Sequence, residues 1–149
     1  LIERSGTGEV GQGAVTAFYT VLADGDDTTN DPVVDTARAI LDGHIVLSRQ
    51  QTQLGIYPAV DVTASVSRVM SDITPTRHQK AAIRFRRLVS LYMQNRDLML
   101  MGGYSPGQDA ELDLAVALWP KITDYIRQGA NEPCRFPESQ QDLMRLMGE

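Results

Sequence analysis

Short apolar runs bounded by turn residues dominate the first part of the chain. Residues 14–22 are rich in β-branched and aromatic side chains and predict a strand, and residues 44–48 form a second run of strand length. Residues 49–54, which precede the next extended segment, predict a short helix that ends at Gly55. The strand–helix–strand order therefore predicts a parallel crossover.

A helical period begins at Asp31 and Pro32, which have the chemistry of an N-cap and a first helical residue. We expect Gly43 to stop this helix, because glycine tolerates the backbone conformation that ends helices. The predicted buried stripe comprises Val33, Val34, Ala37, Ile40 and Leu41.

Helical spacing takes over after Arg68. Thr74 and Pro75 supply a cap and a first helical residue, and Gly102 with Gly103 supplies a stop, so the pattern predicts one long helix. Its apolar face comprises Ala81, Phe85, Leu88, Val89, Tyr92, Leu98 and Met99. The polar face is either solvated or matched to an acidic partner helix, and it carries Arg84, Arg86, Arg87 and Arg96.

The remaining residues predict shorter helices in a helix–turn–helix arrangement. Asp109 is a candidate N-cap for a helix through Leu118, and Pro120 is expected to open another helix that stops at Gly129. Residues 131–137 are expected to interrupt regular structure. A last short helix follows, and its apolar side comprises Leu143, Met144, Leu146 and Met147.

Composition narrows the classes of function. With 149 residues, 42% of them hydrophobic, the chain can hold one ordinary domain, or the end of one and the whole of another. A net charge of −5 argues against nucleic acid as the main partner, because phosphate backbones bind basic faces. The single cysteine, Cys134, excludes an internal disulfide and suits a reducing cytoplasm. No apolar run approaches the ~20 residues of a membrane span.

Two short motifs resemble ligand sites that their context does not support. Residues 6–11 have the glycine spacing of a dinucleotide-binding loop, but a predicted strand follows them where that motif requires a helix. The acidic residues 24–31 invite a calcium loop, yet its sixth position is Thr29 and its twelfth is Asp35, where calcium loops have Gly and Glu. We therefore expect no metal site here.

The most informative segment is residues 57–70, which begins Tyr-Pro-Ala-Val-Asp and continues Ser-Arg-Val-Met from residue 67. This segment resembles the rotary and export ATPases related to the F-type ATP synthase β subunit. The resemblance implies that Tyr57 packs on adenine. It also implies that Arg68 reaches across a subunit boundary of a homohexamer toward the γ-phosphate in a neighbouring subunit.

Both residue types suit these roles on chemical grounds. The flat ring of Tyr57 can stack on a purine. The guanidinium of Arg68 stays charged and offers forked donors that match phosphate oxygens, and as a finger from a neighbouring chain it is worth about 10³ to 10⁵ in rate. The structural alternatives are a half-buried tyrosine at a turn and an arginine that caps a carbonyl.

Further motifs indicate the branch of this family. Residues 42–49 resemble the Asp-Gly-His-Ile-Val-Leu-Ser-Arg run of bacterial export ATPases, and residues 95–98 and 103–120 look like the flagellar export ATPase. Residues 50–52 depart from the usual pattern, and Gly55 with Ile56 resembles the synthase β subunit. The chain is identified on this basis as a flagellar export ATPase, with a virulence type III secretion ATPase as the alternative.

The resemblance implies an α/β plus all-α fold. Residues 1–72 would be the end of a RecA-like parallel-sheet nucleotide-binding domain, and residues 73–149 a helical C-terminal domain. The chain begins at Leu1 and lacks the family's phosphate-binding loop, magnesium-holding carboxylate and water-positioning glutamate. We therefore expect a C-terminal fragment of an ATPase that uses ATP and Mg²⁺ as a complete protein, whereas the fragment alone binds neither and is inactive.

The partners implied by the resemblance belong to that complete protein. It would form a homohexamer in the cytoplasm, peripheral to the inner membrane, and would unload export substrates from chaperones at a membrane export gate under a stator-like regulator. The segment from Gly102 to Asp113 aligns with an acidic loop of the synthase β subunit and predicts a coiled-coil central-stalk partner. A solvated loop in which Asp109 only caps a helix is the alternative.

Two other functional classes remain open. One is a non-catalytic subunit of a rotary ATPase, which binds nucleotide without turnover. The other is a stand-alone helical interaction module with no nucleotide role. A phosphate-binding loop upstream of Leu1 would favour the ATPase.

Overall fold

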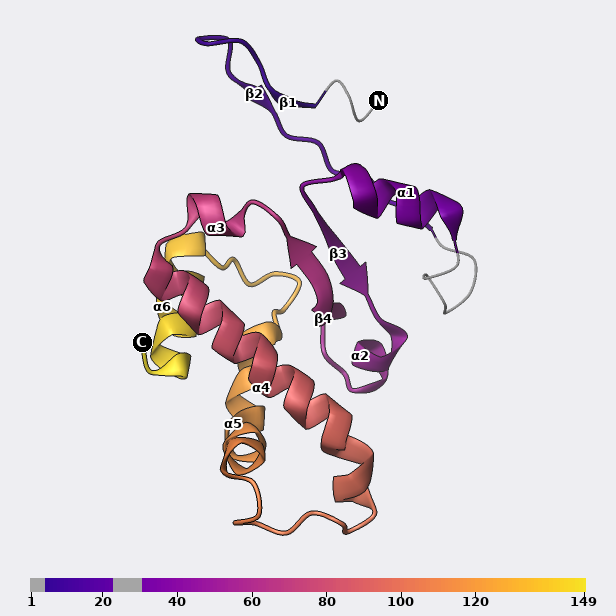
Figure 1. The fold of residues 1–149 in the computed structure, drawn as a ribbon, viewed down its shortest axis with the longest axis vertical. Coiled ribbons are helices and arrows are strands. Elements are labelled where there is room, and N and C mark those ends of the chain that lie inside the picture. The colour runs from indigo at the N-terminus through magenta and orange to yellow at the C-terminus, as the bar shows by residue number, and fades with distance from the viewer. Residues whose placement is uncertain (1–4, 23–30) are drawn as a thin grey trace. The chain divides into compact units, whose positions relative to one another are not determined.

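The computed structural model describes residues 5–22 and 31–149, and the chain divides into two compact units, up to His44 and from Ile45 onward. Figure 1 labels the helices and strands. Most of the acidic stretch that invited a calcium loop, residues 24–30, lies outside the described residues. Within the described ranges, no helix combines the length and the apolar character needed to cross a lipid bilayer.

The first unit contains a small hairpin. Strand β1 (Gly6–Thr7) pairs antiparallel with β2 (Ala14–Val15). The strand predicted over residues 14–22 is therefore wrong beyond Val15. A strand needs a neighbour to pair with, and in the described part of this unit only the two residues of β1 supply one.

Helix α1 (Pro32–Ile40) begins as predicted, because the Asp31 carboxylate accepts hydrogen bonds from the N–H groups of Val33 and Val34 at 2.8 and 3.3 Å. The helix ends before Gly43, which instead starts the next strand. The predicted stripe is only partly buried: Val34 is buried, whereas Val33 and Ile40 are exposed. Periodicity assigned these residues to one face, but it does not specify what covers that face.

Strands β3 (Gly43–Leu47) and β4 (Val60–Ser67) form a two-stranded sheet and are joined through helix α2 (Arg49–Gln53). The two arrows point in opposite directions in Figure 1. In agreement, the Ser48 N–H just after β3 donates to the Ala59 carbonyl just before β4 at 2.8 Å. The predicted parallel crossover is therefore wrong. The five-residue helix α2 is too short to return the chain to the far end of β3.

The second half is helical, as predicted, with α3 (Met70–Ile73), α4 (Thr76–Leu100), α5 (Ala110–Ile126) and α6 (Phe136–Met147). Helix α4 starts one residue later than predicted, with Pro75 as its N-cap. The Thr74 hydroxyl donates to the Met70 carbonyl at 2.6 Å, so it closes the unpredicted helix α3 and does not cap α4. Helix α4 stops where predicted, before Gly102, whose φ is +75°.

The break predicted at Pro120 is wrong, because α5 continues through this residue. Proline inside a helix removes one backbone hydrogen bond and costs about 3 kcal/mol. Packing on both sides offsets that cost: the Trp119 ring stacks on Tyr92 with centroids 3.8 Å apart, and Ile122 is completely buried. The Thr123 hydroxyl also donates to the Trp119 carbonyl, within the turn that contains Pro120.

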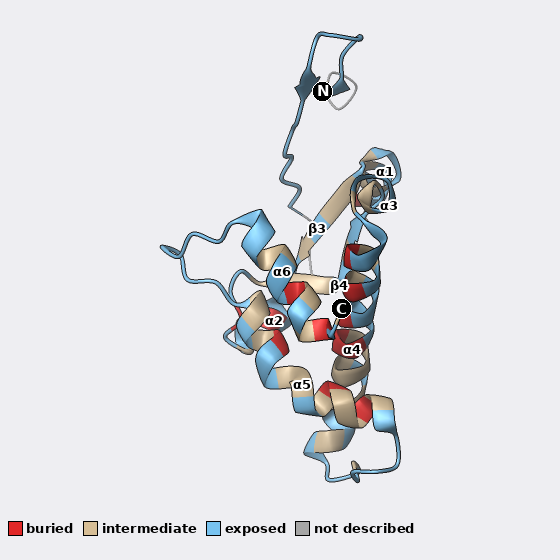
Figure 2. Cartoon of the chain, turned by 90° about the vertical axis from the view of Figure 1, so that its left-hand side faces the viewer, coloured by how far each residue is buried: buried red, intermediate tan, exposed pale blue. Residues whose placement is uncertain are grey.

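The hydrophobic core lies between α4, α5 and α6, whose buried residues face inward (Figure 2). The predicted apolar face of α6 is confirmed, whereas that of α4 is confirmed in part, since Leu98 is 43% exposed. The core comprises Ala81, Phe85, Leu88, Val89, Ala115, Ile122, Leu143 and Met147.

Candidate functional site

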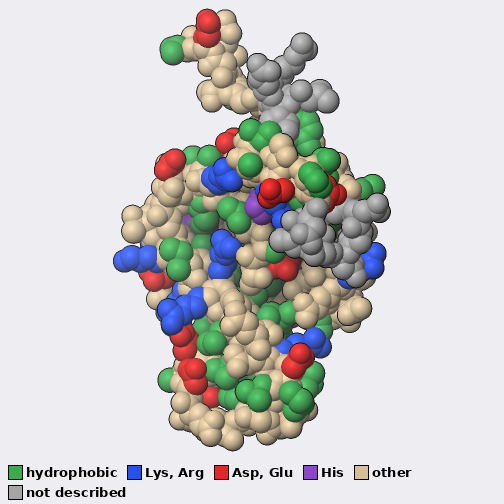
Figure 3. Space-filling view, turned by 45° about the vertical axis from the view of Figure 1, so that its right-hand side comes forward, with side chains coloured by type: hydrophobic (Ala, Val, Ile, Leu, Met, Phe, Trp, Pro, Cys, Tyr) green, Lys and Arg blue, Asp and Glu red, His purple; other side chains and the backbone are tan. Residues whose placement is uncertain are grey.

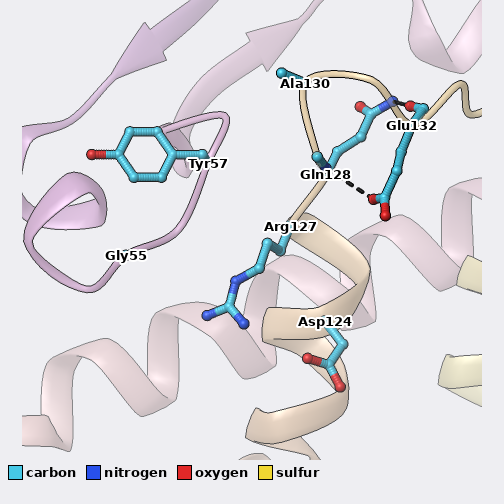
Figure 4. A pocket seen from close by; sticks show the side chains of 8 residues that line it. Gly55, Tyr57, Asp124, Arg127, Gln128, Ala130 and Glu132 are labelled. Atoms are coloured by element: carbon cyan, nitrogen blue, oxygen red, sulfur yellow. Dashed lines mark hydrogen bonds between the residues drawn. The ribbon is translucent and has the colours of Figure 1, made fainter.

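Tyr57 lines a shallow depression of about 460 Å³. It lies in the segment between α2 and β4, its peptide bond to Pro58 is cis, and its side chain is 53% exposed. The tyrosine ring lies on one side of the depression, and the end of α5 with the loop after it lies on the other (Figure 4). The residues opposite the ring are Arg127, Gln128, Gly129, Ala130 and Glu132.

Backbone hydrogen bonds fix both sides of this depression. The Gln128 N–H donates to the Tyr57 carbonyl at 2.8 Å, which joins the loop directly to the tyrosine. Within the loop, the Gln128 side-chain amide donates to the Glu132 carbonyl at 2.7 Å, and the Gly129 N–H donates to the Glu132 carboxylate at 3.0 Å. Ile56, the residue before Tyr57, is 1% exposed and anchors the segment that carries the tyrosine. The ring is therefore presented by a fixed backbone.

The loop opposite Tyr57 was missed by sequence reasoning, which assigned Gly129 only as a helix stop. No local pattern connects residues 127–132 with a tyrosine so far away in the chain. Cys134 lies in the same connection between α5 and α6, and its thiol is exposed.

Arg68 lies at the other end of β4 from Tyr57, directly after the last strand residue, and its side chain is exposed. The eight residues of β4 lie between them, and seven steps of about 3.3 Å span at most roughly 23 Å along a fully extended strand. The structure therefore places the two predicted site residues at opposite ends of β4.

The strand between them is shaped by Asp61. One oxygen of its carboxylate accepts from the Thr63 N–H, the Thr63 hydroxyl and the Ala64 N–H, at 2.9, 2.7 and 2.9 Å. The Ser65 hydroxyl donates to the Asp61 carbonyl and accepts from the Val46 N–H at 3.0 Å. Short polar side chains that bond to nearby backbone stabilise local turns, so Asp61 has a structural role in β4.

The acidic segment between Gly102 and Asp113 has its carboxylates engaged within the chain. Asp109 caps α5 by accepting from the N–H groups of Glu111 and Leu112. Glu111 forms an ion pair with Arg87 of α4, with 2.5 Å between Oε1 and Nε. Of the four arginines on the polar face of α4, Arg87 therefore has an acidic partner on another helix, α5. Its side chain nevertheless remains 68% exposed.

Asp113 fixes the loop before α5. It accepts hydrogen bonds from the Tyr104 hydroxyl and from the Gly107 N–H, the second at 2.8 Å. The hydrogen bond to Asp113 raises the pKa of Tyr104, and partial burial and the negative charge of Asp113 add to this effect. At the end of α4, beside this loop, Leu100 and Met101 are 74% and 78% exposed.

The depression beside Tyr57 combines an aromatic ring with the charged side chains of Asp124, Arg127 and Glu132. An exposed aromatic ring over a shallow depression can hold a planar heterocycle. In the part of the chain that the structure describes, no three His, Cys, Asp or Glu side chains lie close enough together to hold a metal ion. On the face drawn in Figure 3, basic and acidic side chains are interspersed and form no continuous basic surface.

Comparison with known proteins covers nearly the whole chain. The model of the nucleotide-binding domain of the ATP synthase alpha/beta family matches residues 1–67. The model of the C-terminal domain of the type III secretion system ATPase EscN matches residues 74–145.

Individual relatives agree with these matches. The flagellum-specific ATP synthase of Pseudomonas aeruginosa is 48% identical over 99% of this chain and 32% of its own length. The type 3 secretion system ATPase of Pseudomonas savastanoi pv. phaseolicola is 45% identical over 98% of this chain and 32% of its own length. The chain therefore spans about a third of the length of the curated relatives that it matches.

A solved structure confirms the fold. It is that of the assembled ATPase EscN in complex with its central stalk EscO, from the type III secretion system of enteropathogenic E. coli. It superposes with a TM-score of 0.85 at 33% identity, over 97% of this chain and 33% of that one. The chain belongs to the family of flagellar and type III secretion export ATPases, related to the ATP synthase alpha/beta subunits, and it corresponds to the C-terminal part of its members.

Proposed function

We propose that this chain supplies the adenine-stacking side and the arginine finger of an ATPase that couples ATP hydrolysis to flagellar protein export. The observation that carries the proposal is the placement of Tyr57 and Arg68 at opposite ends of the eight-residue strand β4. On this proposal the two residues serve two different nucleotides. A homohexamer provides this arrangement, since each subunit offers Tyr57 to its own nucleotide and Arg68 to its neighbour's.

Arg68 would act on charge that develops at the transferring phosphoryl group. A guanidinium at that position stabilises the transition state more than bound ATP, so it raises turnover and leaves affinity nearly unchanged. Tyr57, with the 127–132 loop opposite it, would hold the adenine. Residues outside this chain would hold the phosphates and Mg²⁺, so the isolated chain would be inactive.

The test is the Arg68→Ala substitution in the full-length protein. ATP affinity is expected to stay within about twofold while turnover falls at least about 10³-fold. Mixing these subunits with a phosphate-loop mutant is expected to restore part of the turnover, because finger and loop come from different chains. Poor ATP binding by the mutant, with no complementation, would show that Arg68 is structural.

The flagellar assignment rests on the residue motifs, since the flagellar and virulence relatives are 48% and 45% identical and do not separate the two branches. Deleting the gene and assaying motility against effector secretion distinguishes the branches. Turnover by the full-length protein excludes a non-catalytic subunit. Loss of that turnover in the Arg68→Ala variant excludes a helical module without a nucleotide role.

The partners of the full-length protein form part of the same proposal. The full-length protein would bind export chaperones with their substrates, a stator-like regulator and the membrane export gate. These contacts would take place in the cytoplasm at the inner membrane. A coiled-coil stalk would contact residues 102–113. The structure of the EscN relative in complex with its central stalk supports a partner of this kind. We place the boundary between the nucleotide-binding and helical domains at residues 72/73.

A further inference from the structure

One hydrogen bond ties the helical half of the chain to the strand that ends at Arg68. The Arg86 guanidinium on α4 donates to the Thr63 carbonyl on β4 at 3.0 Å. The neighbouring side chain on the strand, Val62, packs against the core between the helices. Helix α4 therefore holds β4 through both a backbone group and a side chain.

Thr63 is itself held in place. Its N–H and its hydroxyl both donate to the Asp61 carboxylate, so its carbonyl is the group left to contact α4. From Thr63 the same strand continues to Ser67, and Arg68 follows directly. Thr63 and Arg68 are therefore five residues apart on one continuous segment, whose backbone is fixed to α4 at Thr63.

The next residue on α4 faces a different element. Arg87 is paired with Glu111 in the first turn of α5. From Arg87, α4 runs on to Leu100, a distance of about 20 Å at 1.5 Å per residue, and ends at the loop that starts with Gly102. Arg86, Arg87 and the start of that loop are therefore joined by one continuous helix.

We propose that Arg86 is a positioning residue, which locks β4 to α4 so that the Arg68 guanidinium is held toward the neighbouring nucleotide. This inference rests on the proposed role of Arg68. It assigns a function to a side chain that the sequence pattern places only on a polar face. It also makes turnover sensitive to the orientation of the helical domain, because Arg86, which contacts β4, is on the helix α4 that leads to the loop starting at Gly102.

Three variants of the full-length protein test the proposal. Arg86→Gln is expected to lower the single-turnover rate about tenfold with the Kd for ATP unchanged, which is less than the 10²-fold loss typical of a 1 Å misplacement. Arg86→Lys keeps a donor and a charge and is expected to lose at most about threefold. Lys80→Gln removes the same charge from an exposed position of the same helix and is expected to match the wild type.

A double-mutant cycle identifies the residue through which Arg86 acts. In an Arg68→Ala background, Arg86→Gln is expected to cause no further loss, because the group that it positions is already absent. An equal loss in both backgrounds, a weakened ATP affinity or a failure to assemble would overturn the proposal. Normal turnover by Arg68→Ala alone would instead overturn the proposed function, and the role of Arg86 with it.

Discussion

The Tyr57→Ala substitution isolates the stacking contribution to nucleotide affinity. It removes the ring but keeps the backbone carbonyl that accepts from the Gln128 N–H, and the hydrogen bonds of the 127–132 loop do not involve the ring. Stacking of a base on an aromatic side chain is worth roughly 1 to 3 kcal/mol. Tyr57 is 53% exposed and therefore already partly covered in the free protein, so we expect about 1 to 2 kcal/mol. The Kd for ATP would then rise about 5- to 30-fold at 1.4 kcal/mol per tenfold.

The assay is equilibrium titration of the full-length protein with ATP and Mg²⁺. Tyr57→Phe and Tyr57→Trp serve as matched controls and are expected to stay within about twofold of the wild type, since both keep a ring. GTP affinity is expected to fall with ATP affinity, because every purine has a stacking face. Unchanged affinity in Tyr57→Ala would refute stacking at this site, and an equal loss in Tyr57→Phe would assign the contribution to the hydroxyl.

Three other predictions follow from contacts described above. The double substitution Glu111→Gln with Asp113→Asn removes two charges but keeps groups that can hydrogen bond to Arg87, Tyr104 and Gly107. If these charges steer the stalk, the affinity of the stalk for the assembled protein falls and depends less on salt. No change in the affinity or in its salt dependence would exclude electrostatic docking at this loop. Ile122→Ala creates a cavity at a fully buried position and is expected to lower the free energy of unfolding, measured by denaturant titration, by about 2 to 5 kcal/mol. A loss below about 1 kcal/mol would contradict tight packing around Pro120. The pKa of Tyr104 is raised in the folded state by its hydrogen bond to Asp113, so the linked stability is complete below the ordinary pKa of about 10 and is lost as pH rises through the raised value. The chain has five tyrosines, so the difference in phenolate absorbance between the wild type and Tyr104→Phe isolates the titration of Tyr104, and a difference that titrates at the ordinary pKa would contradict the prediction.

Capping chemistry explains why several helix boundaries could be predicted. Asp31 and Asp109 accept hydrogen bonds from the N–H groups two and three residues ahead, so the information lies within one turn of sequence. Gly102 likewise ends α4 through its own backbone conformation. Thr74 misled the prediction because it ends α3, where its hydroxyl donates to the Met70 carbonyl, and the N-cap position of α4 falls on Pro75.

Contacts between distant segments explain what the sequence could not supply. Local rules stop a helix at Pro120, and only the stacking of Trp119 on Tyr92 and the burial of Ile122 show why α5 continues. The motif identified Tyr57 as a site residue but not the loop that completes its depression. Periodicity placed Arg86 correctly on a polar face, whereas its partner Thr63 is set by how α4 packs on β4.

The exposed thiol of Cys134 makes the depression accessible to direct spectroscopic observation. It is the single cysteine of this chain, and it lies just beyond Glu132, which lines the depression. A maleimide dye attached there would label this part of the protein at one position. In a full-length protein whose other cysteines have been replaced, a change in the emission of the dye on adding ATP would test whether nucleotide reaches the depression beside Tyr57.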